Sequence, residues 1–123
     1  MVFHLIYANF ACEIWKSWQL IDKKVDSKIE VIPEIVPQWD HSPRSGSKKG
    51  TAVFYNATPE LFYQHVKKAL DVIKDKPEEN QLLILKSWNE WAEGNYMEPD
   101  LKYGKGYIRA LRKALEDLTF WRM

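Results

Sequence analysis

The chain has 123 residues, of which 46% are hydrophobic, so it can bury the core of one domain without a metal or a disulfide. Its single cysteine excludes an internal disulfide. Lysine and arginine total 18 against 17 for aspartate and glutamate, and their dispersion along the chain argues against nucleic-acid binding. No apolar run reaches the length of a membrane span and no signal-peptide pattern precedes the first strand, so we expect a soluble, cytoplasmic protein.

Aromatic residues are frequent, with six tryptophans and six tyrosines. Such side chains fill cores, and they also form flat platforms on which sugar rings stack. Histidine and cysteine do not cluster at metal-ligand spacing, so the sequence predicts neither a metal nor another cofactor. His4 and His65 are expected to be structural.

The first predicted elements alternate between strand and helix. Residues 2–7 form a short apolar run typical of a buried strand. Residues 12–23 carry apolar side chains at three- and four-residue spacing, which predicts a helix. Residues 29–35 are apolar and β-branched and predict a strand, although Pro33 restricts it to an edge, an end or a bulge.

A long loop is predicted over residues 36–57, which contain two Pro-led turns. Thr58 is placed to cap a helix that runs to about Lys74. Residues 82–85 are fully apolar and predict a central strand, and residues 106–118 predict a last helix. The apolar stripe of the first of these helices is Phe62, Val66, Ala69, Leu70 and Ile73, and that of the last is Tyr107, Ile108, Leu111, Leu115 and Leu118.

Alternating strands and helices predict an α/β fold with a parallel sheet. Ligands of such folds gather at the carboxyl ends of the strands. Three segments follow a predicted strand and are both aromatic and polar: residues 7–9 with Asn9, the 36–57 loop, and residues 87–105. These segments are therefore the candidate binding regions.

The last of these segments carries two carboxylates, Glu90 and Glu93, among the polar and aromatic side chains of Trp88, Asn89 and Trp91. If the backbone coils as it leaves the strand, both carboxylates lie close together on one face. Paired carboxylates split acid and base roles and are the usual equipment for cleaving or forming glycosidic bonds. The alternative is structural: a glutamate at a helix start complements the dipole, and tryptophan beside a strand end fills the core. The spacing alone does not decide between them.

Residues 87–100, SWNEWAEGNYMEPD, resemble a signature near the C-terminus of the WbsX-type family, described as glycosyltransferases of surface-polysaccharide synthesis. That family is in turn similar to the endo-α-mannosidase family of glycoside hydrolases. Residues 39–44, WDHSPR, and residues 58–60 are similar to further blocks of the family, so the resemblance covers most of residues 2–118. His41 departs from the asparagine expected in its block.

The resemblance implies that Glu90 and Glu93 match the two catalytic carboxylates of the mannosidase family. One carboxylate, Glu90, would deprotonate the 2-hydroxyl of the sugar, and Glu93 would protonate the leaving oxygen. A 1,2-anhydro sugar would form and open with overall retention. Asp40 and Arg44 are candidates for binding hydroxyls, with an Asp40–Arg44 ion pair as the alternative. Tyr96, Glu98 and Tyr103 are further candidates at the mouth of the site, although residues 98–100, Glu-Pro-Asp, also fit a plain turn.

Residues 1–123 are therefore expected to form the C-terminal part of a partial (β/α)8 TIM barrel, with about three βα units, since a closed barrel needs about 250 residues. The expected ligand is an oligosaccharide or a sugar donor. Uncovered sheet edges predict a tendency to self-associate, and the isolated chain is expected to lack part of the substrate site. Two alternatives to an enzyme stay open: a non-catalytic carbohydrate-binding module, and a remnant without function.

Overall fold

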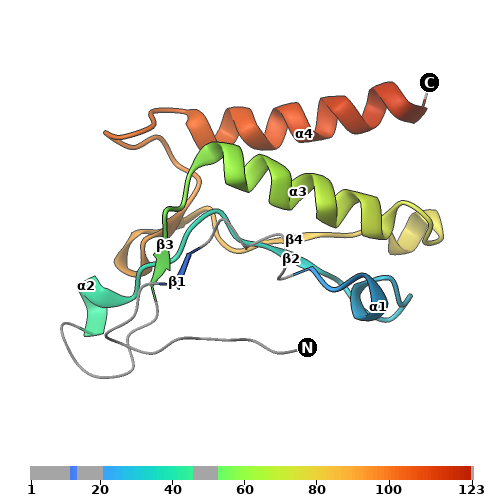
Figure 1. Ribbon diagram of the computed structural model, residues 1–123, viewed down its shortest axis with the longest axis horizontal. Coiled ribbons are helices and arrows are strands. Elements are labelled where there is room, and N and C mark those ends of the chain that lie inside the picture. The colour runs from blue at the N-terminus through green and yellow to red at the C-terminus, as the bar shows by residue number, and fades with distance from the viewer. Residues whose placement is uncertain (1–11, 14–20, 46–52, 123) are drawn as a thin grey trace.

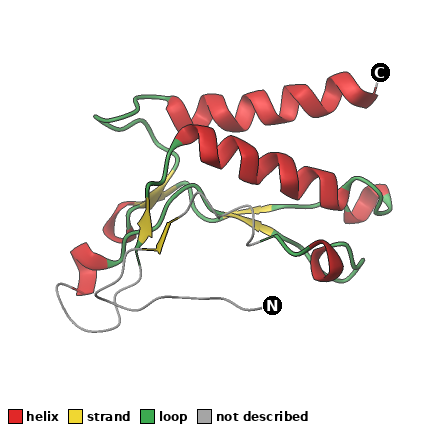
Figure 2. Ribbon diagram, viewed as in Figure 1, coloured by secondary structure: helices red, strands yellow, loops and turns green. Residues whose placement is uncertain are grey.

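The computed structural model describes residues 12–13, 21–45 and 53–122 as a mixed α/β structure in which two long helices lie side by side over short strands (Figure 1). Figure 2 shows that helix and loop account for most of the described chain and that the strands are short. In chain order the elements are β1 (Cys12–Glu13), α1 (Lys23–Asp26), β2 (Glu34–Ile35), α2 (Ser42–Ser45), β3 (Phe54–Tyr55), α3 (Pro59–Ile73), the 3₁₀ helix η2 (Glu78–Asn80), β4 (Ile84–Leu85), β5 (Asn89–Glu90), the 3₁₀ helix η3 (Trp91–Glu93), β6 (Asn95–Tyr96) and α4 (Gly106–Arg122).

The described strands form three two-stranded sheets. β1 pairs with β3 and β2 pairs with β4, both in parallel, while β5 and β6 pair antiparallel as a hairpin. In the β2–β4 pair, the backbone N–H groups of Ile84 and Lys86 each donate to carbonyls of the β2 segment at 3.0 Å. The α/β class and the parallel pairing expected from the sequence are confirmed. The partial barrel stays a prediction.

Helix α3 follows the sequence prediction closely. Thr58 is its N-cap and accepts a hydrogen bond from the Leu61 N–H at 3.2 Å, with Pro59 in the first turn. All five residues of the predicted apolar stripe are buried. Fully buried His65 accepts a hydrogen bond at Nε2 from the Val36 N–H at 3.2 Å, which ties α3 to the β2 segment. The structural role expected for His65 fits this contact.

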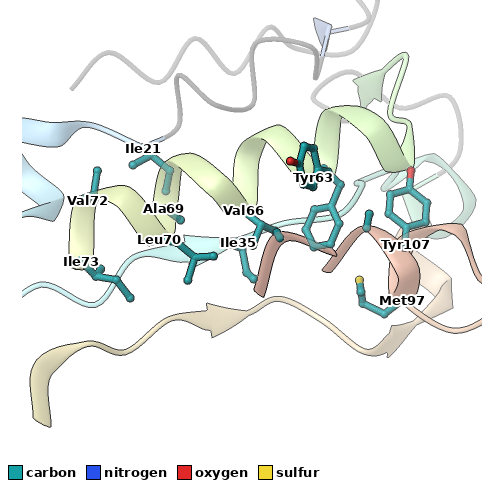
Figure 3. Packing of buried hydrophobic residues seen from close by; sticks show 13 residues of the cluster. Ile21, Ile35, Tyr63, Val66, Ala69, Leu70, Val72, Ile73, Met97 and Tyr107 are labelled. Carbon is teal, nitrogen blue, oxygen red and sulfur yellow. The ribbon is translucent and has the colours of Figure 1, made fainter. Parts of the chain in front are cut away.

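Helix α4 begins at Gly106 as predicted, and its buried face overlaps the predicted stripe at Tyr107, with Leu111 and Leu118 partly buried against the core. The side chains that it buries are Tyr107, Ala110 and Ala114, and Figure 3 shows Tyr107 packed beside Met97 and the α3 side chains. Small alanines let α3 and α4 approach closely. Leu115 of the predicted stripe is instead 45% exposed, so that part of the prediction is wrong. The apolar residues of α4 fit either of two adjacent faces of the helix, and packing against α3 buries the face that carries Ala110 and Ala114.

The N-terminal half departs further from the prediction. The helix predicted over residues 12–23 is wrong at both ends, because Cys12–Glu13 form β1 and Ile21 lies in a bend. Asp22 caps α1 and accepts a hydrogen bond from the helix backbone at 2.9 Å, so the helix begins only after it. The rest of that predicted helix and the strand predicted over residues 2–7 lie outside the described residues.

The segment predicted as a loop, residues 36–57, contains α2, β3 and an isolated bridge between Asp40 and Val53. The strand predicted over residues 82–85 forms only at Ile84–Leu85 and is less enclosed than a central strand, since Leu82 and Ile84 are about half exposed (50% and 47%). Leu85 packs against the core on the side of the helices. Within the described residues, helix α3 thus packs against one face of the β2–β4 pair.

Candidate active site

The candidate carboxylates stand on a tight hairpin that follows β4. Glu90 ends β5, Trp91–Glu93 form one 3₁₀ turn, and Gly94 returns the chain into β6 with φ +52°. The Gly94 N–H donates to the Trp91 carbonyl at 3.0 Å and closes the turn. The sequence interpretation had the backbone coil as it leaves the strand predicted over residues 82–85. In the structure Glu90 is still extended in β5, and the coil is the 3₁₀ turn that follows it.

The hairpin is fixed against the segment that precedes α2. The Asp40 N–H donates to the Glu93 carbonyl at 2.8 Å. A side chain at Gly94 would place its Cβ 2.8 Å from the Asp40 Cβ, so only glycine permits this approach. The Asp40 carboxylate accepts from the Ser42 N–H at 2.9 Å and from the Ser42 hydroxyl, which orients the start of α2.

From α2, Arg44 reaches both carboxylates. Its Nη1 lies 3.0 Å from Glu93 Oε1 and its Nη2 lies 3.2 Å from Glu90 Oε1. The two glutamates thus face one planar guanidinium, which brings their side chains to the same side of the hairpin. Arg44 forms its ion pairs with these glutamates, and the Asp40–Arg44 ion pair that the sequence offered as an alternative is not formed.

The surroundings of the two carboxylates are unequal. The Glu93 side chain is 18% exposed and also has His41 Nε2 at 3.7 Å from its Oε1. The Glu90 side chain is 41% exposed, and Arg44 is its partner. The His41 ring stacks on Trp39 with a centroid separation of 6.3 Å. His41, whose role the sequence left in doubt, is thus a neighbour of the more enclosed carboxylate.

Aromatic side chains flank the carboxylates. Trp91 and Tyr96 stack with centroids 3.7 Å apart, and Trp91 is 46% exposed. The Trp91 indole N–H donates to Glu98 at 2.5 Å, and the Tyr96 hydroxyl donates to Asp100 at 3.3 Å. Burial, together with the charge of Asp100, raises the pKa of the Tyr96 hydroxyl. The structure therefore gathers three candidates from the sequence, Trp91, Tyr96 and Glu98, into one cluster.

A buried asparagine supports the hairpin from below, and sequence reasoning missed it. The Asn95 side chain is fully buried, and its amide donates to the Gln38 carbonyl at 2.6 Å and to the Lys86 carbonyl at 2.9 Å. It links the end of β4 to the segment before α2. Nothing in the local sequence distinguishes Asn95 from an exposed turn residue, because both of its acceptors are backbone groups distant in the chain.

The remaining candidates lie elsewhere. Trp88 is 49% exposed and lines an open groove of about 340 Å³ against α4, together with Ile108 and Leu111. Asn89 is exposed on β5. Tyr103 is half-buried, and its hydroxyl donates to the Ala57 carbonyl at 3.3 Å, a contact that supports the start of α3. Asn9 lies outside the described residues.

Neither a metal centre nor a membrane span is found in the part of the chain that the structure describes. Histidine, cysteine, aspartate and glutamate do not gather there in groups of three or more that could hold a metal ion. Likewise, none of the described helices is long and apolar enough to cross a membrane.

Comparison with known proteins adds a family. A model of the family described as glycosyltransferase WbsX matches residues 5–111. Two proteins named uncharacterized protein WxcX are similar to the chain, both from Xanthomonas campestris pv. campestris. The one from strain B100 is 24% identical over 116 residues, which are 90% of this chain and 16% of the relative. The one from strain ATCC 33913 is 30% identical over 84 residues, 68% of this chain and 12% of the relative. The chain thus spans less than a fifth of these relatives, and no solved structure matches it significantly.

Proposed function

The chain belongs to the WbsX glycosyltransferase family, and from that membership we propose that it contributes the catalytic segment of an enzyme that acts on glycosidic bonds in surface-polysaccharide assembly. The observation that carries the proposal is the placement of Glu90 and Glu93 on one side of a hairpin, facing one guanidinium. Two carboxylates within the reach of a single group suit a reaction whose two proton transfers occur at neighbouring atoms.

The reaction that we propose uses the 2-hydroxyl of the sugar as the nucleophile. Glu90 takes the proton of that hydroxyl, the freed oxygen attacks the anomeric carbon, and the bond to the leaving oxygen breaks as Glu93 protonates it. A 1,2-anhydro sugar forms. Water or a hydroxyl of an acceptor sugar then attacks the anomeric carbon and opens the anhydro ring with overall retention. Glu93 takes the proton of the attacking hydroxyl, and Glu90 returns its proton to the 2-oxygen, so both carboxyl groups regain their starting states. Direct displacement would instead require carboxylates on opposite sides of the scissile bond.

The aromatic cluster supports sugar binding beside these carboxylates. One face of Trp91 is covered by Tyr96, while nearly half of the side chain is exposed. Such a face stacks on the apolar side of a sugar ring, and the Glu98 carboxylate at the indole edge is an acceptor for hydroxyl groups. We therefore assign the substrate contacts to Trp91 and Tyr96, with Asn89 as an exposed amide on the same hairpin.

We also propose that the chain forms part of a (β/α)8 barrel. Support comes from the parallel β2–β4 pair, against which α3 packs, because parallel strands covered by helices make up such a barrel. The exposed apolar side chains of Leu82 and Ile84 lie on the segment that a barrel would enclose. In the longer relatives there is ample chain to supply the remaining units.

The test is product analysis with two probes, a nucleotide sugar and an α-mannoside oligosaccharide, using the wild-type protein and the variants Glu90→Gln and Glu93→Gln. Because positioned acids and bases contribute about 10²- to 10⁴-fold, we expect either variant to lose at least about a hundredfold in kcat while sugar binding persists. Glu79→Gln on the exposed η2 segment is the matched control. Turnover unaffected by both site variants would refute the assignment.

The same experiment separates the alternatives. Wild-type protein that binds the oligosaccharide without turnover, and binds it equally well in both variants, is a carbohydrate-binding module, which the exposed Trp91 face also suits. Wild-type protein that neither binds nor converts either probe counts against both functions.

A further inference from the structure

The sequence offered two roles for Arg44, binding of substrate hydroxyls and an ion pair with Asp40, and its contacts in the structure suggest a third. Both of its terminal nitrogens are engaged, one with Glu93 at 3.0 Å and the other with Glu90 at 3.2 Å. The side chain projects from α2, whose start is oriented by Asp40, and Asp40 is bound through its backbone to Glu93. The guanidinium and the hairpin are therefore held in register by contacts other than the ion pairs.

We propose that Arg44 is a positioning residue that aligns the carboxylates of Glu90 and Glu93 toward one ligand, an inference that rests on the proposed function. A guanidinium is a planar fork, so two oxygens bound to its two terminal nitrogens are oriented relative to each other. Lysine carries one nitrogen centre and imposes no such relation. Arg44 acts through the two glutamates and makes no contact with the substrate itself.

A merely stabilising ion pair is a poor account of these contacts. The Arg44 side chain is 51% exposed, and exposed ion pairs contribute little to folding stability. Misplacement of reacting groups, by contrast, costs on the order of a hundredfold in rate. Loss of Arg44 is therefore expected to change catalysis far more than stability.

The kinetic test compares the wild-type protein with Arg44→Ala and Arg44→Lys on whichever probe the wild-type protein converts. We expect kcat to fall by about ten- to a hundredfold in both variants, with KM unchanged or lowered. Added guanidinium ion should restore kcat of Arg44→Ala, because it can occupy the space between the carboxylates. The control is Arg112→Ala, which removes an exposed arginine paired with Glu116 on α4.

Two kinetic outcomes would overturn the inference. A raised KM with kcat retained would show that Arg44 binds the substrate, and unchanged kinetics would show that it has no role. Full activity of Arg44→Lys would show that charge alone suffices and that the fork is not needed.

A second measurement keeps this inference separable from the proposed function. In nitrogen NMR spectra, a guanidinium held by two carboxylates rotates slowly, so Arg44 should give two resolved terminal-nitrogen signals that merge in Glu90→Gln and in Glu93→Gln. An Arg44 as mobile as Arg112 in the wild-type protein overturns the positioning role even if the enzyme is active. A wild-type protein without turnover counts against the proposed function. The NMR result then shows only whether Arg44 binds both carboxylates at the same time.

Discussion

Gly94 is the residue on which the contact between the hairpin and the α2 segment depends most directly. It has φ +52°, and a Cβ at this position would lie 2.8 Å from the Asp40 Cβ, 3.1 Å from its nitrogen and 3.3 Å from its Cα. Gly104 has nearly the same φ, +53°, but a Cβ there would meet nothing within 4 Å. Comparing an alanine substitution at Gly94 with one at Gly104 therefore distinguishes the free-energy cost of the backbone conformation from the cost of steric overlap with Asp40.

The expected magnitudes follow from these two positions. A left-handed conformation costs a residue with a Cβ about 1–2 kcal/mol, so Gly104→Ala should lower the free energy of unfolding by that amount. Gly94→Ala should lose the same amount and, in addition, about 1 kcal/mol or more as the Asp40 N–H moves away from the Glu93 carbonyl, to which it donates at 2.8 Å. Urea unfolding at neutral pH measures both variants.

Activity should separate the two variants more sharply than stability. Gly94→Ala displaces the segment that carries Arg44 relative to Glu93, whereas Gly104→Ala leaves both unaltered. We therefore expect a loss of turnover in Gly94→Ala at temperatures where the protein remains folded, and none in Gly104→Ala. If the two variants are equally stable, the close approach at Asp40 carries no energetic weight and the account of the junction is wrong.

Two further substitutions test the helices. Thr58→Ala removes the acceptor for the Leu61 N–H and should cost about 1 kcal/mol in urea unfolding, whereas Thr58→Ser should retain most of it. Tyr63→Phe removes the hydroxyl that donates to Asp117 at 2.5 Å and accepts from Lys113 at 3.1 Å. The Tyr63 hydrogen bond is the largest of the causes that hold the pKa of Asp117 below its usual value. A carboxyl with a lowered pKa in the folded state stabilises the protein above its unfolded-state pKa, and this contribution disappears as the pH falls through the folded-state pKa. Tyr63→Phe should therefore destabilise the protein at pH 7 and have less effect near pH 3, and an effect independent of pH would contradict this reasoning.

Local signals in the sequence predicted the long helices well. Helix α3 is specified by Thr58 at its N-cap, by Pro59 in its first turn and by the apolar stripe along its fifteen residues. All of these signals lie in the helix itself or directly before it. The pattern failed where tertiary contacts decide. Residues 12–13 begin the segment for which the apolar spacing predicted a helix, yet they pair with β3 at Phe54 and Tyr55, more than forty residues away.

The candidate site divides in the same way. The proximity of Glu90 and Glu93 could be predicted because the two residues are three positions apart in the chain, although the coil follows β5 and not the strand predicted over residues 82–85. The ion pairs of Arg44 with these glutamates join positions 46 and 49 residues apart, and the hydrogen bonds of Asn95 reach a backbone carbonyl 57 residues away. The type of a residue does not specify a partner so distant in the chain. The sequence therefore offered Arg44 a substrate hydroxyl or Asp40 as its partner, and not the two glutamates.

The way in which the hairpin is held bears on how its substitutions can be interpreted. Its supports are the Gly94–Trp91 and Asp40–Glu93 backbone hydrogen bonds, at 3.0 and 2.8 Å, and the buried side chain of Asn95. None of them uses the carboxylate of Glu90 or Glu93. Replacing either carboxylate by an amide therefore leaves the supports intact. It removes the charge and alters the contact with Arg44, and for Glu93 also the contact with His41. A loss of turnover in those variants can then be assigned to the chemistry of the carboxylates, whereas the same loss in Asn95→Ala would reflect collapse of the hairpin and should come with a lower free energy of unfolding.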